Sequence, residues 1–261
     1  YTVTDGTVSG TMRLDAYTSA TASQEILNRF NIKALNLDHD QVFTESCRLI
    51  ISEKYRGGHI LPALARKAYQ LNTQIFKAIY SFQYGNAGLV DYYRKLGFRP
   101  YAAELIHNED GIRIPMINVV NDVGYYETSN SPLSGLVRDF HNENPQDNTS
   151  AIKHLLKENH RFVMDRNEVW SNVERHLTGT VNTTFIKQLS QEALKELTNI
   201  GVILKVKPRR KLIREQLIEQ ELFVVLDGIF ELTKGNYTTR LVHQGDVFGE
   251  LAMFLDSKVR T

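Results

Sequence analysis

The sequence contains almost no cysteine: Cys47 is the only one in 261 residues. A single thiol excludes an internal disulfide and a cysteine-rich metal site, and it suits a reducing, cytoplasmic compartment. The eight histidines are scattered, with no HExxH motif or comparable spacing of metal ligands. We therefore expect this chain to bind no metal.

Strong charge of one sign and long apolar runs are also missing. The formal net charge is +1, so no overall basic field favours binding to nucleic acid. No apolar run approaches the roughly 20 residues of a spanning helix, so we expect no integral membrane segment. The first residues lack a signal-peptide pattern. With 42% hydrophobic and 23% charged residues, the sequence is typical of soluble globular proteins with one large or two ordinary domains.

Residues 1–130 alternate strand-like and helix-like patterns, which predicts an α/β domain. A helix is expected over residues 60–71, where apolar residues recur at helical spacing and Pro62 falls in the first turn. A shorter helix over residues 89–96 ends at Gly97, a residue that tolerates a left-handed backbone. Strands are expected over residues 7–14, 42–51 and 75–84.

Residues 131–200 are predicted to form a linker and a helical connector. Residues 129–148 are rich in Asn, Ser, Asp and Pro, a composition typical of linkers, and helical patterns follow. From residue 201 onward the pattern changes to short strands with tight turns. Asp227-Gly228 lies between two apolar strand patterns and predicts a hairpin, and Gly235-Asn236 marks another turn.

The last fourteen residues place backbone amides, a carboxylate and a guanidinium within reach of one small phosphate-bearing ligand. They resemble the phosphate-binding cassette of cyclic-nucleotide-binding domains, in which an FGELA-type run precedes an Arg-Thr or Arg-Ala pair. The resemblance implies a small antiparallel β-barrel (a jelly roll) over residues 201–261 that binds cAMP or cGMP. Two glycines that are usual in that family are replaced here, by Arg209 and Gln216.

The same resemblance implies a role for each cassette residue. Glu250 takes the ribose hydroxyl, and Arg260 pairs with the phosphate as a permanently charged, bidentate donor. Thr261 offers a hydroxyl to a guanine base, which suits cGMP, although cAMP sites tolerate the same Arg-Thr pair. The backbone of Gly249, Leu251 and Ala252 is expected to approach the ligand closely.

Three features of the N-terminal half suit a thioester donor. A predicted strand runs into Arg56-Gly57-Gly58-His59 and then a helix, where free amides and the helix dipole can hold a pyrophosphate. Asn86 ends the next predicted strand, and Tyr93-Arg94-Lys95-Leu96-Gly97-Phe98 follows on the next helix. This ordered set resembles the GNAT superfamily of N-acyltransferases. The resemblance implies a mixed sheet with flanking helices, and an Asn86 side chain that holds the cofactor arm.

A narrower resemblance concerns two strands. Gly10-Thr11-Met12-Arg13-Leu14 followed by Glu45-Ser46-Cys47-Arg48-Leu49 is similar to acyl-homoserine-lactone synthases and to long-chain N-acyl amino acid synthases. In those families the two strands face the acyl chain and the amine. The resemblance implies a fatty acyl thioester donor, acyl carrier protein or acyl-CoA, and a small-molecule amine acceptor.

The predicted chemistry is direct transfer. An amine must lose a proton to attack a thioester, so Glu45, directly or through a water, is the predicted base, with a pKa raised by burial. Backbone amides from Leu49 to Ile51 would hold the thioester oxygen. Tyr93 occupies the position from which a phenol protonates the leaving thiolate.

Arg13 and Arg48 suit a substrate carboxylate or a network that orients Glu45. A regular strand sends Glu45 and Arg48 to opposite faces, and a β-bulge between them would bring both to one face. Where the superfamily pattern has Gly or Ala, this chain has His59 and Leu61, whose side chains crowd a pyrophosphate. That favours a carrier-protein donor, or a domain that no longer catalyses.

Each residue also has a purely structural interpretation. Glu45 could be a strand carboxylate paired with Arg13, and Tyr93 could be a core phenol. The Arg-Gly-Gly loop could be a plain turn, and Cys47 is expected to pack in the interior because direct transfer needs no thiol nucleophile.

Three functions stay open at this point. The favoured one is an N-acyltransferase gated by a cyclic nucleotide, and the second is a non-catalytic sensor whose degenerate acyltransferase domain binds an acyl ligand or a partner protein. A transcription regulator is disfavoured by the neutral charge and by the absence of a helix-turn-helix after Thr261. Relative to the families, we expect elements to be missing at both ends of the chain. A homodimer is compatible with the sequence.

Overall fold

The computed structural model describes residues 1–101, 105–108, 111–157, 171, 189–201, 203–206, 208–209, 211–213, 221–235 and 237–249. The chain divides into two compact units. The first unit comprises Tyr1–Leu105 and Ile114–Asn159, and the second comprises Ile106–Arg113 and His160–Thr261.

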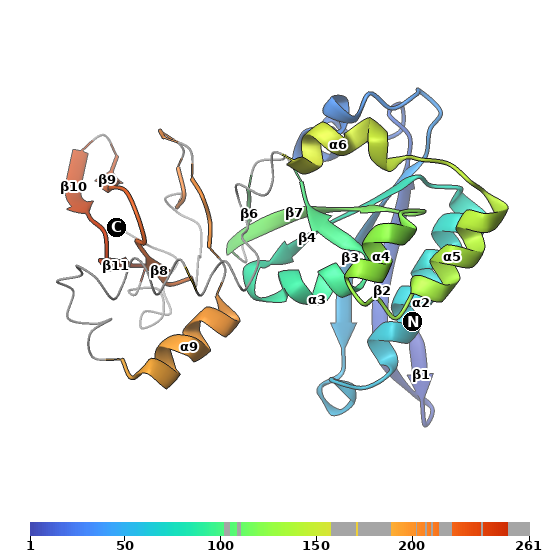
Figure 1. Cartoon of the computed structure of the whole chain (residues 1–261), viewed down its shortest axis with the longest axis horizontal. Coiled ribbons are helices and arrows are strands. Elements are labelled where there is room, and N and C mark those ends of the chain that lie inside the picture. Colours follow the sequence, from blue (N-terminus) through green and yellow to red (C-terminus); the bar gives the residue numbers. More distant parts are fainter. Residues whose placement is uncertain are drawn as a thin grey trace. The chain divides into compact units, whose positions relative to one another are not determined.

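A mixed sheet forms the frame of the first unit (Figure 1), and its strands run in the order β1-β2-β3-β4-β7-β5. β6 and the residues of β7 with which it pairs, 111–113, belong to the second unit. β3 and β4 are parallel, whereas β1–β2, β2–β3 and β5–β7 are antiparallel. The strands are β1 (Thr2–Thr4), β2 (Thr7–Tyr17), β3 (Phe43–Ile51), β4 (Tyr80–Asn86), β5 (Phe98–Pro100), β6 (Ile106–Asn108) and β7 (Gly111–Val119).

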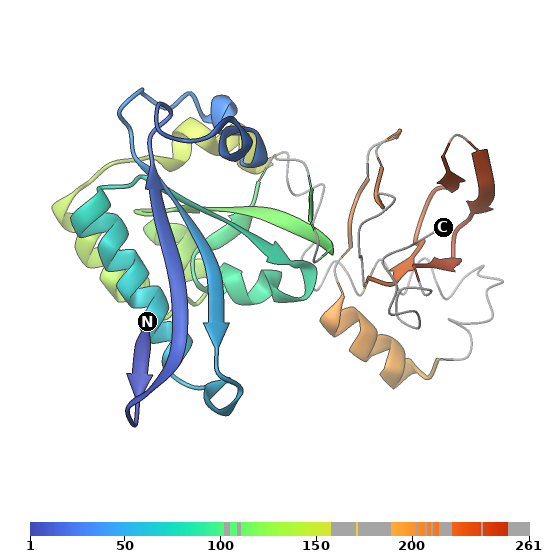
Figure 2. The ribbon, with the colours of Figure 1, turned by 180° about the vertical axis from the view of Figure 1, so that it is seen from behind.

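Helices flank both faces of this sheet, so the predicted mixed α/β architecture is confirmed for the first unit. α2 and α5 lie side by side on one face in Figures 1 and 2. The rings of Tyr69 and Phe140 meet edge to face. The helices are α1 (Gln24–Arg29), η1 (Ile32–Leu35), η2 (Glu53–Tyr55), α2 (Ile60–Gln70), η3 (Leu71–Phe76), η4 (Ala87–Leu89), α3 (Val90–Lys95), α4 (Val123–Thr128), α5 (Ser134–Glu143) and α6 (Thr149–Lys157).

An aromatic cluster fills the space between the sheet and the layer of α1, η1 and α6. The ring of Phe82 stacks on Phe30 at 5.3 Å and meets Phe43 edge to face at 5.7 Å. The Tyr101 hydroxyl donates to the Phe30 carbonyl at 2.7 Å, which satisfies its only polar group inside the core. This cluster packs the first residues of β3 and β4 against the C-terminal end of α1.

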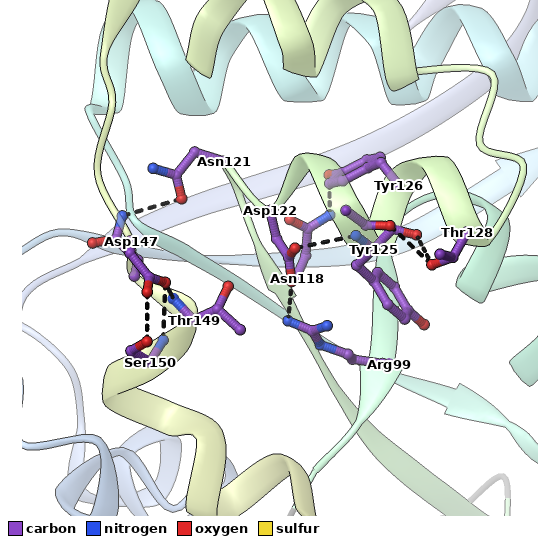
Figure 3. A network of polar contacts seen from close by, with 12 residues as sticks. Arg99, Asn118, Asn121, Asp122, Tyr125, Tyr126, Thr128, Asp147, Thr149 and Ser150 are labelled. Atoms are coloured by element: carbon purple, nitrogen blue, oxygen red, sulfur yellow. Dashed lines mark hydrogen bonds and ion pairs between the residues drawn. The ribbon is translucent and has the colours of Figure 1, made fainter. Parts of the chain in front are cut away.

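A polar network ties the ends of β5 and β7 to the starts of α4 and α6 (Figure 3). Arg99 Nη2 lies 2.6 Å from Asp122 Oδ2, and the guanidinium stacks over the Tyr125 ring. Asp122 also caps α4 by accepting from the Tyr125 amide at 3.1 Å. Asp147 caps α6 in the same way, through the amides of residues 149 and 150. These caps satisfy helix amides that would otherwise lack acceptors.

Most local predictions for the first unit are confirmed. The helix expected over residues 60–71 is α2, and the strand expected over 42–51 is β3. The strand expected over 75–84 begins only at Tyr80, because a π-helical turn, η3, extends α2 to Phe76. The linker expected over 129–148 was wrong in part: α5 lies there and buries Val137 completely.

The second unit contains α9 (Gln191–Ile200) and two short antiparallel sheets. β9 (Phe230–Lys234) and β10 (Tyr237–Val242) pair across the turn predicted at Gly235. β8 (Phe223–Val224) pairs with β11 (Val247–Phe248). Among the residues that the structure describes, these sheets do not form a closed barrel.

The hairpin predicted at Asp227-Gly228 was wrong. Gly228 does take a left-handed turn, with φ +89°, but the strands on either side pair elsewhere. Backbone bonds from Val225 N to Asp246 O at 3.0 Å and from Gly245 N to Val225 O at 2.7 Å hold β8 to the segment before β11. Long-range pairing therefore overrides the local turn signal.

Gly97 is expected to be essential for the fold of the first unit. Its φ is +90°, and a Cβ there would lie 2.2 Å from the buried Tyr126 ring. We expect Gly97→Ala to lower the free energy of unfolding by about 2–5 kcal/mol through backbone strain and overpacking. Gly135→Ala is the control, because its added Cβ meets no atom within 4 Å and it lies in α5. Equal urea midpoints for the two variants would contradict this prediction.

Candidate active site

β3 and β4 separate along their length. They pair in parallel from Phe43↔Tyr80 to Glu45↔Phe82 and make no further pair in the described part of the chain. β3 continues to Ile51 and β4 to Asn86, and Figure 2 shows the two strands diverging. The edge of β3 that faces β4 therefore carries backbone groups without a strand partner beyond Glu45.

A β-bulge interrupts β3 close to this point. Thr11 pairs with Ile50 and Arg13 with Cys47, so Arg48 and Leu49 together face a single residue of β2. Arg48 takes the left-handed bulge position with φ +51°, and its side chain is exposed. The bulge thus follows Cys47, one step later than expected, and the pleat is regular from Glu45 to Cys47.

Glu45 is buried at the last paired position of β3. It is 5% exposed and lies directly opposite Asp15 of β2. Its Oε1 accepts from Arg29 Nη1 at 3.3 Å, while Arg29 also pairs with Glu25 on α1 and lies over the Tyr84 ring. Arg13 does not pair with Glu45, because its guanidinium binds Asp15 on its own strand at 2.8 Å.

Burial raises the pKa of the Glu45 carboxyl above its ordinary value. The Arg29 guanidinium opposes this shift in the pKa, and the Asp15 carboxylate adds to it. A carboxylate of raised proton affinity, held where two strands part, is suited to accept a proton from a bound group.

Tyr93 lies on the other face of the sheet. A Cβ at Gly85 would come within 2.8 Å of the Tyr93 ring, so the absence of a side chain at Gly85 makes room for the phenol. Phe82 points into the aromatic cluster, and residues three apart on a strand point to opposite faces. Glu45 and Tyr93 therefore border the divergence of β3 and β4 from opposite sides.

The loop before α2 has the features of an anion cradle. Gly57 takes φ +76°, and Arg56 Nε donates to the Ile51 carbonyl at 3.2 Å, which closes the end of β3. α2 begins at Ile60 after His59, whose side chain makes no capping hydrogen bond. The helix start is thus uncapped by a side chain, although one amide donor of its first turn is absent because residue 62 is proline.

Asn86 uses its carbonyl oxygen within its own loop. Oδ1 accepts from the Gly88 amide at 3.1 Å and caps η4. The Asn86 side chain is exposed.

Two functional candidates were missed by the sequence analysis: Asp15 and Arg29. Asp15 could have been found, because it stands two positions after Arg13 and so shares its face. No local sequence pattern pointed to Arg29, because only the packing of α1 against the sheet brings it to Glu45.

Most of the predicted cyclic-nucleotide cassette lies outside the described residues, namely Glu250, Leu251, Ala252, Arg260 and Thr261. Gly249 is described, with φ +90° and with Glu221 O only 2.6 Å from the place of a Cβ. Its neighbour Phe248 stacks on Phe223 at 5.0 Å. Arg209 adopts φ +65°, the left-handed backbone that glycine favours.

Within the described ranges, no helix is long and apolar enough to cross a membrane. The same residues contain no group of three or more His, Cys, Asp or Glu side chains that could hold a metal ion.

No protein-family model matches this chain, and no curated protein matches it. FeeM and ElaA are among the solved structures that are similar over part of it. FeeM, an N-acyl amino acid synthase from uncultured soil microbes, is 13% identical, with a TM-score of 0.38 over 49% of this chain and 69% of its own. ElaA from Escherichia coli is 17% identical, with a TM-score of 0.26 over 41% of this chain and 99% of its own. Likenesses this weak assign neither a family nor an activity.

Proposed function

We propose that the first unit is a GNAT-like N-acyltransferase that moves an acyl group from a thioester to an amine. The observation that carries this proposal is the buried Glu45 carboxylate at the point where β3 and β4 diverge. Its burial and raised pKa suit a general base, and the divergence leaves a strand edge free for a substrate.

The proposed reaction is a direct transfer. The amine nitrogen gives a proton to Glu45 as it bonds to the carbonyl carbon, and the carbonyl oxygen takes the negative charge. Backbone amides of β3 that face β4 near the bulge donate to that oxygen. The carbon–sulfur bond then breaks, and the thiolate takes a proton from Tyr93. Acid and base act from opposite faces of the sheet.

The proposed donor is a fatty acyl thioester on coenzyme A or on acyl carrier protein. The uncapped start of α2 and the loop from Arg56 to His59 support binding of a pyrophosphate or phosphopantetheine phosphate. The Asn86 amide would hold the pantetheine arm. The exposed Arg48 at the bulge is available to a carboxylate of the acceptor amine.

We further propose that cAMP or cGMP bound by the second unit regulates this transfer. The left-handed backbone at Arg209 and the close packing of Gly249 support a loop geometry like that of the nucleotide-binding family. Regulation requires that the nucleotide bind two arrangements of the protein with different affinity. The alternative is a sensor whose first unit binds an acyl ligand without turnover.

Glu45→Gln is expected to abolish most of the acyl transfer. Removing a general base lowers the rate by about 10²–10⁴-fold. The measurement is mass spectrometry of lipid extracts from cells that express either protein, which also reveals the acyl chain and the acceptor. The exposed Glu143→Gln is the matched control. If wild-type and Glu45→Gln extracts match, with and without added cyclic nucleotide, the sensor is favoured over the enzyme.

Gly58→Ala separates a cofactor cradle from a plain turn. The nearest atom to an added Cβ is Tyr55 O at 3.6 Å, so the fold should be undisturbed. A methyl group in the cradle should weaken coenzyme A binding by about tenfold, or 1.4 kcal/mol, in calorimetry. Gly135→Ala, remote from the loop, serves as the control. If Gly58→Ala binds coenzyme A with unchanged affinity, the loop is a plain turn. If the wild-type chain binds acyl carrier protein but not coenzyme A, acyl carrier protein is the donor.

Arg260→Gln is expected to weaken cyclic-nucleotide binding by about tenfold or more, since it removes a charged donor from the phosphate. Titration calorimetry of the full chain with cAMP, cGMP and non-cyclic AMP checks this. Lys234→Gln, an exposed cation of the same unit, is the control. No binding of either cyclic nucleotide to the wild-type chain would refute the regulatory proposal.

A further inference from the structure

Two carboxylates face each other at the candidate active site. Asp15 of β2 and Glu45 of β3 are direct cross-strand partners. Side chains in such a pair have Cβ atoms about 4.5–5.5 Å apart, so each carboxylate lies in the field of the other. Each has a guanidinium of its own: Arg13 for Asp15 and Arg29 for Glu45.

The two carboxylates have different surroundings. Arg13 Nε lies 2.9 Å from Asp15 Oδ1 and 2.8 Å from Oδ2, and the Asp15 side chain is 23% exposed. The Glu45 side chain is 7% exposed, its only ion pair within the described residues spans 3.3 Å, and Arg29 shares its charge with Glu25. Asp15 is therefore the more exposed and more closely ion-paired carboxylate of the two, and Glu45 is the buried one that is placed to take a proton.

We propose that Asp15 is a positioning residue that keeps Glu45 in a proton-accepting state, and that Arg29 opposes it from the other side. This inference rests on the proposed role of Glu45 as the base. It also changes the role expected for Arg13, which acts through Asp15 by holding that carboxylate in place beside Glu45, without touching the substrate.

No other group described around Glu45 takes over the role proposed for Asp15 or for Arg29. Cys47 places its Sγ 3.9 Å from Asp15 Oδ2, and burial raises the pKa of its thiol, so it adds no charge near neutral pH. Burial likewise raises the pKa of the Tyr17 hydroxyl above its ordinary value. The charged and titratable groups that interact with Glu45 are Arg13, Asp15 and Tyr17 on β2, Cys47 on β3, and Arg29 on α1. Glu25 and Tyr84 interact with Arg29, and Arg48 interacts with Cys47.

The two neighbours should move the titration of Glu45 in opposite directions. Loss of a negative charge beside a carboxyl favours its ionised form, whereas loss of a positive charge disfavours it. Asp15→Asn should shift the titration midpoint of Glu45 to lower pH, and Arg29→Gln should shift it to higher pH. Arg29→Lys keeps the cation and should restore a midpoint near that of the wild type.

The experiment follows the Glu45 carboxyl by NMR in the full chain, with ¹³C-labelled glutamate and Glu45→Gln to identify the signal. Asp40→Asn and Arg66→Gln are the matched controls, because both residues are exposed and make no ion pair within the described residues. Thermal unfolding of each variant confirms that it is folded over the pH range used. If Asp15→Asn does not fold, the Arg29→Gln and Arg29→Lys pair still tests whether Glu45 responds to its neighbours.

Opposite shifts for Asp15→Asn and Arg29→Gln, beyond those of the controls, support the proposal. A midpoint in Asp15→Asn that stays at the wild-type value or moves to higher pH overturns it. In the pH profile of kcat/KM, the midpoint of the rise on the acidic side should shift in the same direction as the Glu45 titration for each variant. A wild-type chain without acyl transfer defeats the proposed function while the NMR titration still decides the role of Asp15. An active chain whose acidic limb ignores Asp15→Asn defeats the positioning role alone.

Discussion

The separation of β3 from β4 is the constraint on which the rest of the site depends. The strands are held together only as far as Glu45↔Phe82, where the Phe30–Phe43–Phe82 cluster packs beneath them. Beyond that point the bulge at Arg48 bends β3, and the two strands diverge. The same geometry exposes a backbone edge, places Glu45 at the end of the paired region, and lets Tyr93 approach beside Gly85 from the other face.

Holding Glu45 in the interior costs folding free energy. Its folded-state pKa is raised above the unfolded value, so the native state binds more protons between those two pKa values. Stability therefore falls as the pH rises through this window, which begins near the ordinary pKa of glutamate. The aromatic cluster and the ion pair with Arg29 offset this cost. A buried carboxylate that destabilises the fold at neutral pH is typical of residues kept for chemistry.

Local signals made much of the fold predictable, whereas tertiary contacts decided the rest. The periodicity of α2, the strand pattern of β3 and the left-handed Gly97 all lie in short segments and were predicted correctly. α5 was missed because polar residues surround its single buried Val137. The prediction of a hairpin at Asp227-Gly228 was wrong because β8 pairs with β11, which is distant in the sequence. In the candidate site, Glu45 was selected because its strand resembles that of acyl-homoserine-lactone synthases, and its role as a base stays a prediction. Its ion-pair partner Arg29 comes from a helix whose docking no local pattern indicates.

The surroundings of Cys47 argue for direct transfer and against an acyl-enzyme on this residue. The thiol lies two residues from Glu45 on the same strand and face, so it has to be considered as a nucleophile. Thiol reactivity requires the thiolate, and burial together with the charges of Glu45 and Asp15 raises the pKa of Cys47. The two carboxylates that suit an incoming amine thus disfavour a thiolate at the same place. In the proposed direct transfer the amine needs only a proton acceptor, which is the role proposed for Glu45 between Asp15 and Arg29.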